Sequence, residues 1–348
     1  MITALDIGTY SIKLIQSEIN DDKINIINHC EKIINSSKVE LDEMDASHTI
    51  AAIQELTADL NINPKKIKAI STGLPGRKAS IKQITTIDME EAELATSLEF
   101  EAKKHIPLDG TDAILDFHII GQNKKEVDKI DLILVATSRN IIQNHNELIK
   151  KAGYKPGPFG VDALAIYNSY LYHNDLPQEG VDVIISIGYS STTLICCGLN
   201  HRFFVRELEI SGLHFIDEIM KSFSIPKEDA ISKLAELGLE SFTEGDNEEI
   251  DTSDPLAIKV EKKTVHSNLV EELRKTLRYY MKSSKQAFFN KFHLTGGGAS
   301  IPGLEKYIKD ELNVELEVFN PFSDLMSDSD DCNSKYTTAL GLVLGHKE

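Results

Sequence analysis

The chain contains one hairpin pattern twice, as LDIGTYSIKLI at residues 5–15 and as ISIGYSSTTLI at residues 185–195. Each copy reads as an apolar strand, a glycine-led turn rich in hydroxyl groups, and a second apolar strand. Repetition of this hairpin indicates a duplicated domain, so we expect an α/β protein of two similar halves, each with a mixed five-stranded sheet flanked by helices. A shift of 180 positions leaves these pairs identical: Ile7/Ile187, Gly8/Gly188, Ser11/Ser191, Leu14/Leu194 and Ile15/Ile195.

The residues of the two turns suit phosphate binding. A glycine lets the backbone come close to a ligand, and the N–H and hydroxyl groups of such a turn can converge on phosphate oxygens. Lys13 adds a positive charge beside the first turn, and Asp6, at the end of its strand, is placed to hold water around Mg²⁺. An ordinary β-hairpin with a glycine turn would explain either copy alone. Two copies in one chain favour a phosphate group held between the halves.

A third glycine turn lies in LTGGGASIPGL at residues 294–304. An apolar strand end is followed there by three glycines and then by the start of a helix. Bare glycines expose N–H groups and leave room for a flat ligand, and a helix N-terminus favours an anion. The alternative is a tight strand–helix turn, which would need only one or two glycines.

The composition limits the classes of ligand and compartment. The 348 residues include 37 Lys and Arg against 55 Asp and Glu, a formal net charge of −18. A surface this acidic repels nucleic acid and anionic lipid, so neither is expected as a direct ligand. The four cysteines lack the spacing of a metal site, and Cys196 and Cys197 are predicted as small core side chains on opposite faces of a strand. The start MITALDIG is not a signal peptide, and no stretch approaches the ~20 apolar residues that span a bilayer. We therefore expect a cytoplasmic protein.

The character of the chain changes at Asp88. Asp88 and Glu91 form a capping box before a helical pattern, and residues 114–120 and 130–136 are predicted strands joined by a polar turn. Residues 87–150 are therefore predicted to form a compact insert. Other predicted helices cover residues 48–60, 140–152, 161–172 and 265–285, with residues 156–160 as the entry loop of the third.

One segment of the second half is strongly acidic. Residues 240–254 contain seven acidic and no basic side chains. This composition predicts a mobile, solvated loop, with partner binding as the alternative.

Taken together, the three glycine turns resemble those of the actin-like ATPase superfamily, and within it the chain resembles the PilM family of cytosolic actin-like components of type IV pilus machines. The resemblance extends over nearly the whole chain. The segment at 98–121 is the most specific, because it resembles the relocated third subdomain of PilM and of the division protein FtsA. The matching segments are LDIGTYSIKLI (5–15), LEFEAKKHIPLDGTDAILDFHIIG (98–121), KAGYKPGPFGVDALAIYNSYL (151–171), ELRKTLRYY (272–280), LTGGGASIPGLEKYIKDELNVELEVFNPF (294–322) and TALGLVL (338–344).

The resemblance implies an actin-like, ribonuclease H-like, duplicated two-domain fold with an inserted 1C subdomain. The implied domains are 1A at residues 1–86, completed by 151–180 and 322–348; 1C at 87–150; and domain 2 at 181–321, with 213–285 as its outer helical part.

The resemblance also implies a site for ATP and Mg²⁺ between the two domains. Asp162, in the helix that joins them, is a candidate to orient a hydrolytic water, with a helix cap as the alternative. The implied ligands are Asp6 for the metal; Gly8, Thr9, Tyr10, Ser11 and Lys13 for the β- and γ-phosphates; Gly188, Ser190 and Ser191 from the other side; Glu272 and Lys275 near the ribose; and Gly296, Gly297 and Gly298 for the adenosine, with Ile301 beside the adenine.

The second turn departs from the family pattern at its first position. That position is usually an aspartate, which helps to organise the water shell of the metal, and here it is Ser186. We therefore expect ATP to be bound and to be hydrolysed slowly or not at all, so that the nucleotide acts as a structural or conformational element.

The resemblance implies a scaffold function. Such a protein binds the N-terminal cytoplasmic tail of the inner-membrane protein PilN beside the inserted subdomain, which places it at the inner membrane through its partners. Other pilus motor components, or self-association, are further candidate partners. An FtsA-like filament protein would carry a C-terminal amphipathic membrane helix, whereas this sequence stops at residues 345–348, directly after TALGLVL. A small-molecule kinase would need a substrate pocket with a catalytic aspartate in the first half, and we find no such motif.

Overall fold

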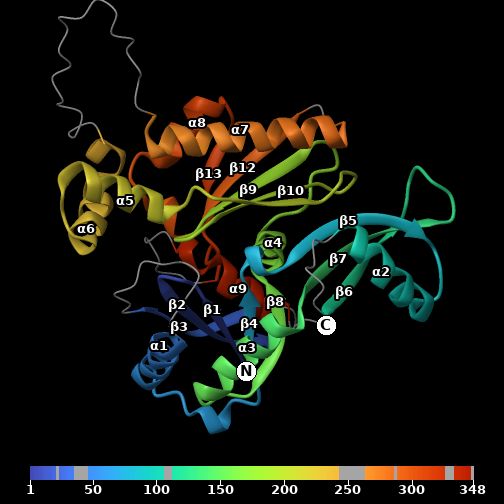
Figure 1. Ribbon diagram of the computed structural model, residues 1–348, viewed down its shortest axis with the longest axis horizontal. Helices are drawn as coiled ribbons and strands as arrows, with labels where there is room; N and C mark the ends of the chain where they lie inside the picture. Colours follow the sequence, from blue (N-terminus) through green and yellow to red (C-terminus); the bar gives the residue numbers. More distant parts are fainter. Residues whose placement is uncertain are drawn as a thin grey trace, which may run out of the picture.

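The two halves of the chain build the same five-stranded sheet (Figure 1). The computed structural model describes residues 1–20, 23–34, 46–105, 112–242, 263–285, 288–325 and 333–345. The first sheet contains β1 (Ile2–Ile7), β2 (Ser11–Asn20), β3 (Lys23–Ile33), β4 (Ile70–Leu74) and β8 (Pro156–Val161). The second sheet contains β9 (Val181–Ile187), β10 (Thr192–Cys197), β11 (Phe204–Leu208), β12 (Phe289–Thr295) and β13 (Leu316–Val318).

Both sheets have the same topology. The strand orders are β3-β2-β1-β4-β8 and β11-β10-β9-β12-β13. In each sheet the first three strands form an antiparallel meander, and the other two run parallel to the central strand. This repetition confirms the predicted α/β fold of two similar halves.

Helices cover both faces of each sheet. They are α1 (Ala46–Asp59), α3 (Arg139–Lys151), α4 (Asp162–His173), α5 (Gly212–Phe223), α6 (Lys227–Leu237), α7 (Val265–Ser284), α8 (Leu304–Leu312) and α9 (Thr337–Leu344). Along β1, Leu5 packs against α1 and α3, whereas Ala4 packs against α4 and α9. Along β10, Cys196 packs with α5 to α8, whereas Cys197 faces α4, which confirms the predicted alternation of these two cysteines. Helix α4 therefore lies between the two sheets, with α9 beside it (Figure 1). None of the helices in the described part of the chain is long and apolar enough to cross a membrane.

Strand β8 lies where the sequence predicts an entry loop. It pairs in parallel with β4 at the edge of the first sheet, with Gly160 opposite Gly73. An edge strand tolerates proline, because one of its sides makes no ladder hydrogen bonds. Gly157 permits the close approach, since a Cβ atom there would lie 2.7 Å from the carbonyl oxygen of Ile70. The loop prediction was wrong because proline and glycine read as strand breakers unless the position at an edge is known.

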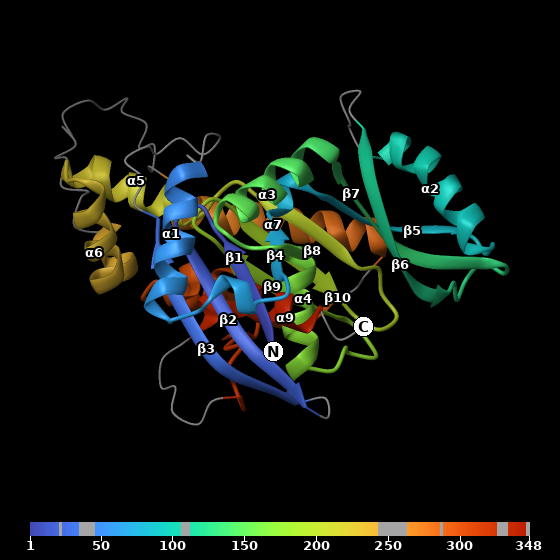
Figure 2. The same cartoon turned by 90° about the horizontal axis from the view of Figure 1, so that it is seen from below.

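A third, smaller sheet projects from one side of the molecule (Figure 2). Its antiparallel strands β5 (Ser80–Ile87), β7 (Lys129–Ser138) and β6 (Ala113–Gln122) are covered by α2 (Glu91–His105). Leu94 and Leu98 of α2 are buried in the core of this sheet. Helix α3, which follows β7, packs instead on the first sheet, where Ile149 is buried beside Leu56. The third sheet with its helix thus uses residues 80–138.

Strand β5 attaches the third sheet to the second. The guanidinium of Arg202 donates to the carbonyl oxygen of Gln83 at 3.1 Å, and the N–H of Phe203 donates to the side-chain oxygen of Gln83 at 2.6 Å. One edge strand of the third sheet is therefore held against the segment that leads into β11.

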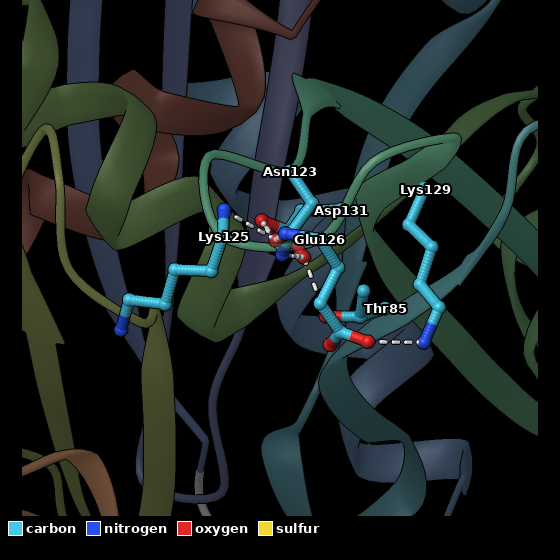
Figure 3. A network of polar contacts seen from close by, with 6 residues as sticks. All are labelled: Thr85, Asn123, Lys125, Glu126, Lys129 and Asp131. Atoms are coloured by element: carbon cyan, nitrogen blue, oxygen red, sulfur yellow. Dashed lines mark hydrogen bonds and ion pairs between the residues drawn. The ribbon is translucent and has the colours of Figure 1, made fainter.

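The turn between β6 and β7 is held by a polar network (Figure 3). The side-chain oxygen of Asn123 accepts from the N–H groups of Lys125 and Glu126 at 2.9 and 2.8 Å. The amide of Asn123 donates to Asp131 at 2.9 Å, and Asp131 also accepts from the hydroxyl of Thr85 at 2.6 Å. One carboxylate on the middle strand thereby joins the turn to β5.

The acidic stretch is described only at its start. Residues Gly238–Phe242 form a short 3-10 helix in which Ser241 and Phe242 are buried. Residues 243–254 lie outside the described residues, so the loop predicted there stays a prediction.

Candidate functional site

The two repeated turns close in the same way. The N–H of Gly8 donates to the carbonyl oxygen of Ser11 at 3.1 Å, and the N–H of Gly188 donates to that of Ser191 at 2.9 Å. A Cβ atom at either glycine would lie 2.9 Å from the carbonyl oxygen that closes its turn. Both positions therefore need glycine for the same steric reason.

The two turns face each other across the halves. The rings of Tyr10 and Tyr189 are stacked, with centroids 5.0 Å apart and planes inclined by 23°. Helix α5 begins against the second turn, because the N–H of Gly212 donates to Gly188 and that of Leu213 donates to Tyr189, both at 2.9 Å. The structure thus brings the first and second turns together.

The third glycine turn packs on the end of β9. Gly296 has φ +82°, and a Cβ atom there would lie 2.6 Å from the carbonyl oxygen of Ile187, directly before the second turn. A Cβ atom at Gly298 would lie 2.3 Å from Cγ2 of Ile187, whereas Gly297 has open space around it. All three glycine turns therefore meet at one end of the second sheet.

The sequence predicts a helix directly after the glycines, and the structure differs in detail. Residues Gly297–Ser300 form a short 3-10 helix, and α8 begins only at Leu304 after the N-cap residue Gly303. Ile301, predicted to lie beside an adenine, is 8% exposed in the core on the outer face of the second sheet. Pro302 and Gly303 separate the glycine turn from the helix, since neither continues a helix well.

Asp6 lies at the end of β1 and is 8% exposed. Its carboxylate lies 3.6 Å from Nζ of Lys13, the residue directly opposite on β2. Burial raises the pKa of Asp6, while the charge of Lys13 opposes this shift and that of Glu31 adds to it. A buried carboxylate beside one lysine can thus bind a metal cation once a ligand brings further negative charge.

Ser11 and Glu31 form a second polar contact of the first half. The hydroxyl of Ser11 donates to Glu31 at 2.6 Å, and Nζ of Lys335 lies 2.6 Å from the other carboxylate oxygen. Although burial opposes it, these hydrogen bonds from Lys335 and Ser11 hold the pKa of Glu31 below its usual value. The hydroxyl of Ser11, a predicted phosphate ligand, therefore has a partner within the protein.

Asp162 is the first residue of α4 and faces the same region. The N-cap residue is Val161, so Asp162 does not occupy the capping position itself. Burial raises the pKa of Asp162 well above its usual value, and the charges of Asp6 and Glu207 raise it further while that of Lys13 lowers it. Gly73 leaves room for this side chain, since a Cβ atom there would lie 2.1 Å from Oδ1 of Asp162.

The predicted ribose ligands lie on α7, in the layer of helices opposite α4. Nζ of Lys275 is 3.1 Å from Glu271, one turn earlier on the same helix. Within the described residues, no hydrogen bond or ion pair joins Glu272 or Lys275 to the glycine turns. Their role at a ribose stays a prediction.

The three glycine turns meet between two similar sheets, and comparison of the sequence with known protein families points to the same fold. Over residues 4–347 the chain matches the family described as type IV pilus assembly protein PilM. The chain belongs to the PilM family. The resemblance seen in the sequence is thereby confirmed.

Solved structures support the PilM assignment at the level of the fold. A structure described as a PilM–PilN type IV pilus biogenesis complex has a TM-score of 0.82 with this chain, at 20% identity, and the match covers 100% of this chain and 98% of the other. MreB5 of Spiroplasma citri bound to ADP has a TM-score of 0.51 at 12% identity, covering 99% of this chain and 96% of MreB5. These likenesses confirm the predicted actin-like fold.

A curated relative from another branch of this superfamily is also similar. Cell division protein FtsA of Bacillus subtilis (strain 168) is 24% identical over 373 residues, which cover 99% of this chain and 82% of FtsA.

Sequence reasoning missed two residues that this PilM-family chain places at the site, Glu31 and Glu207. Each lies on the third strand of its meander, opposite a residue of the repeated hairpin. Only the strand register reveals this, because neither glutamate belongs to a local motif.

The residues present fit a magnesium-bound nucleotide. The hydroxyl of Thr9, within the first turn, is buried and has no hydrogen-bond partner among the described residues. The described residues contain no group of three His, Cys, Asp or Glu side chains that could hold a metal alone. Mg²⁺ suits such a site, because it keeps several waters and is bound through one or two carboxylates and the phosphates of a substrate.

Proposed function

We propose that this PilM-family protein binds ATP with Mg²⁺ between its two sheets and holds the cytoplasmic N-terminal tail of a PilN-like inner-membrane protein. The match to the PilM family over residues 4–347 carries this proposal. The protein then acts as a cytoplasmic scaffold of the type IV pilus assembly complex and is held at the inner membrane by its partner.

The nucleotide part of the proposal is supported by the three glycine turns. Asp6 would hold the metal through water, Lys13 and the turn from Gly8 to Ser11 would contact phosphates, and the second turn would contact them from the opposite half. The bound magnesium would neutralise negative charge at the site, and the bound nucleotide would link the two halves. MreB5, which shares the fold, was solved bound to ADP, and this supports the binding of a nucleotide.

Binding between the halves has a mechanical consequence. A ligand that contacts both turns binds the closed arrangement more tightly than the open one, and so it shifts the population toward closure by that difference in affinity. The third sheet is held to the second sheet through Gln83. Closure therefore also changes the position of the third sheet relative to the first sheet.

The partner part of the proposal places the tail beside the third sheet. Strand β6 is an edge strand, since β5 and β7 complete the order β5-β7-β6. Ile119 and Ile120 on this strand are 44% and 51% exposed, and Ile87 at the end of β5 is 60% exposed. Exposed apolar side chains on an edge strand suit an extended peptide.

The test is the binding of a synthetic PilN-like tail peptide, measured by fluorescence anisotropy. A deletion of residues 87–150 would also remove Ile149 from the core of the first sheet, so a smaller excision is better. Ser80 and Ala136 are direct partners in the ladder, and removal of residues 81–135 leaves two ends that a short glycine turn can join.

We expect wild type to bind the peptide and the excised protein to lose this binding while it still binds ATP. Circular dichroism and retained ATP binding serve as the folding controls. Full peptide binding by the excised protein would refute the placement beside the third sheet. No binding by wild type would refute the partner assignment itself.

A further inference from the structure

The two halves carry equivalent rows of side chains across their meanders. In the first sheet, Asp6 on β1 pairs with Lys13 on β2, and Lys13 pairs with Glu31 on β3. In the second sheet, Ser186 on β9 pairs with Thr193 on β10, and Thr193 pairs with Glu207 on β11. Residues directly opposite each other in a ladder lie on the same face of the sheet. Glu207 is therefore the counterpart of Glu31, just as Ser186 is the counterpart of Asp6.

The charges in these rows differ. The first row has two carboxylates, and both have cationic partners: Asp6 lies 3.6 Å from Lys13, and Glu31 lies 2.6 Å from Lys335. The second row has one carboxylate, that of Glu207, and it has no ion pair within the described residues. Its Oε1 accepts from the hydroxyl of Thr193 at 2.7 Å.

The second oxygen of Glu207 is without a partner. Oε2 is buried and accepts no hydrogen bond from any described residue. A buried carboxylate oxygen without a donor or a cation costs free energy, and a cation beside it offsets that cost.

Glu207 also reaches from the second half into the first. A Cβ atom on Gly76, in the segment after β4, would lie 2.2 Å from Oε1 and 2.6 Å from Cδ of Glu207. Asp162 lies beside Gly73, near the end of β4, and the charges of both Asp6 and Glu207 raise its pKa. The Glu207 carboxylate thus lies near the end of β4, as the Asp162 carboxylate does.

We propose that Glu207 is the second-half carboxylate that positions the hydrated Mg²⁺ of the bound nucleotide, in place of the carboxylate that Ser186 lacks. The inference rests on the proposed nucleotide function and assigns to it a residue outside the repeated hairpins. In the proposed arrangement Glu207 acts through a water of the metal, since Mg²⁺ usually keeps several of its waters when it is bound. It is a positioning residue, and its effect depends on the presence of magnesium.

The experiment compares ATP binding by calorimetry in excess Mg²⁺ and in excess EDTA. The variants are Glu207→Gln and, as a control with the same charge change two residues away, Glu209→Gln at an exposed position. In Mg²⁺ we expect Glu207→Gln to weaken ATP binding about tenfold. In EDTA we expect the variant to bind ATP as tightly as wild type or more tightly, because a carboxylate near the phosphates repels them.

A loss of affinity in Mg²⁺ without a loss in EDTA separates the proposal from a structural role of Glu207, which would weaken ATP binding in both conditions. The double variant Ser186→Asp with Glu207→Gln tests the replacement directly, and we expect it to recover most of the magnesium effect. Gly76→Ala provides a second variant, because its methyl group would displace the carboxylate without removing it, and we expect the same loss in Mg²⁺.

The outcomes distinguish the inference from the proposed function. If wild type and Glu207→Gln show the same gain in affinity from Mg²⁺, the role of Glu207 is refuted while nucleotide binding stands. If wild type binds no ATP in either condition, the nucleotide function is refuted and the role of Glu207 with it.

Discussion

The ring of Tyr10 in the first glycine turn stacks on the ring of Tyr189 in the second, with centroids 5.0 Å apart. Each turn follows the central strand of its sheet, so this contact joins the two halves at their repeated hairpins. Nζ of Lys227 on α6 lies 5.3 Å from the centroid of the Tyr189 ring. Tyr189 therefore contacts both the first turn and the outer helix α6.

We predict a measurable coupling between the two tyrosines. In a double-mutant cycle of Tyr10→Leu and Tyr189→Leu, the free energy of unfolding in urea should show an interaction of about 0.5–1.5 kcal/mol, the range for aromatic pairs beyond area burial. A cycle of Tyr10→Leu with Tyr172→Leu, near the C-terminal end of α4, is the control and should be additive within about 0.5 kcal/mol. An additive Tyr10/Tyr189 cycle would contradict the stack.

Asp6 should decide the affinity for magnesium-bound ATP. Its carboxylate is the first-half group placed to hold the water of the metal, and Lys13 is its neighbour at 3.6 Å. In calorimetry, Asp6→Ala should weaken Mg-ATP binding by at least about tenfold, or about 1.4 kcal/mol. Asp175→Ala, at an exposed position after α4, is the control and should bind as wild type does. Equal affinities of Asp6→Ala and wild type would remove Asp6 from the site.

Asp162 should make the folded protein less stable as the pH rises. Burial raises its pKa, and the charges of Asp6 and Glu207 add to the effect. A carboxyl with a higher pKa in the folded than in the unfolded state holds its proton more tightly when folded. The free energy of unfolding therefore falls as the pH rises from the usual pKa of aspartate, about 4, through the raised value.

The test is thermal unfolding of Asp162→Asn and wild type between pH 4 and pH 7. Asparagine stays uncharged, so the variant should unfold at a higher temperature than wild type at pH 7, and the difference should shrink toward pH 4. Asp175→Asn should show no such pH-dependent difference. A lower midpoint of Asp162→Asn at pH 7 would mean that the carboxylate has a stabilising partner.

The repeated hairpins could be predicted from the sequence because their signals are local. A glycine turn between two apolar strands needs only neighbouring residues, and the offset of 180 positions links Gly8 to Gly188 without any structure. The register across β10 and β11 carries no such signal. The length of the loop between β10 and β11 sets which residue stands opposite Thr193. The place of Glu207 at the site could therefore not be predicted.

Strand β8 shows a different limit of the sequence. Local propensity disfavours PGPFGV as a strand, and tertiary context overrides it, because β4 offers a free edge and Gly157 allows the backbones to approach. The position of Ile301 beside an adenine was implied by the resemblance and not by the pattern of the residues. The structure places this side chain in the core of the second half, and its role at an adenine stays a prediction.

Two adjacent glycines provide a matched test of the third turn. A Cβ atom on Gly298 would lie 2.3 Å from Cγ2 of Ile187, whereas one on Gly297 would meet no atom within 4 Å. Without nucleotide, Gly298→Ala should lower the free energy of unfolding by about 1–3 kcal/mol through overpacking. Gly297→Ala should change it by no more than about 0.5 kcal/mol. Equal effects of the two substitutions in urea unfolding would contradict this packing of the turn on β9.

Turnover of ATP should be slow. Ser186 stands where the first half has Asp6, and a hydroxyl at this position cannot act as the carboxylate does. Glu207, as proposed, supplies a carboxylate from the second half that helps to bind the metal. Position 186 itself still has no carboxylate. Phosphate release at saturating Mg-ATP should therefore stay below roughly 1 s⁻¹, the lower end of the range of working kinases. Asp6→Ala, assayed in parallel, measures any contaminating ATPase. A faster rate that disappears in Asp6→Ala would show that the nucleotide is a substrate of the protein and not a structural element of it.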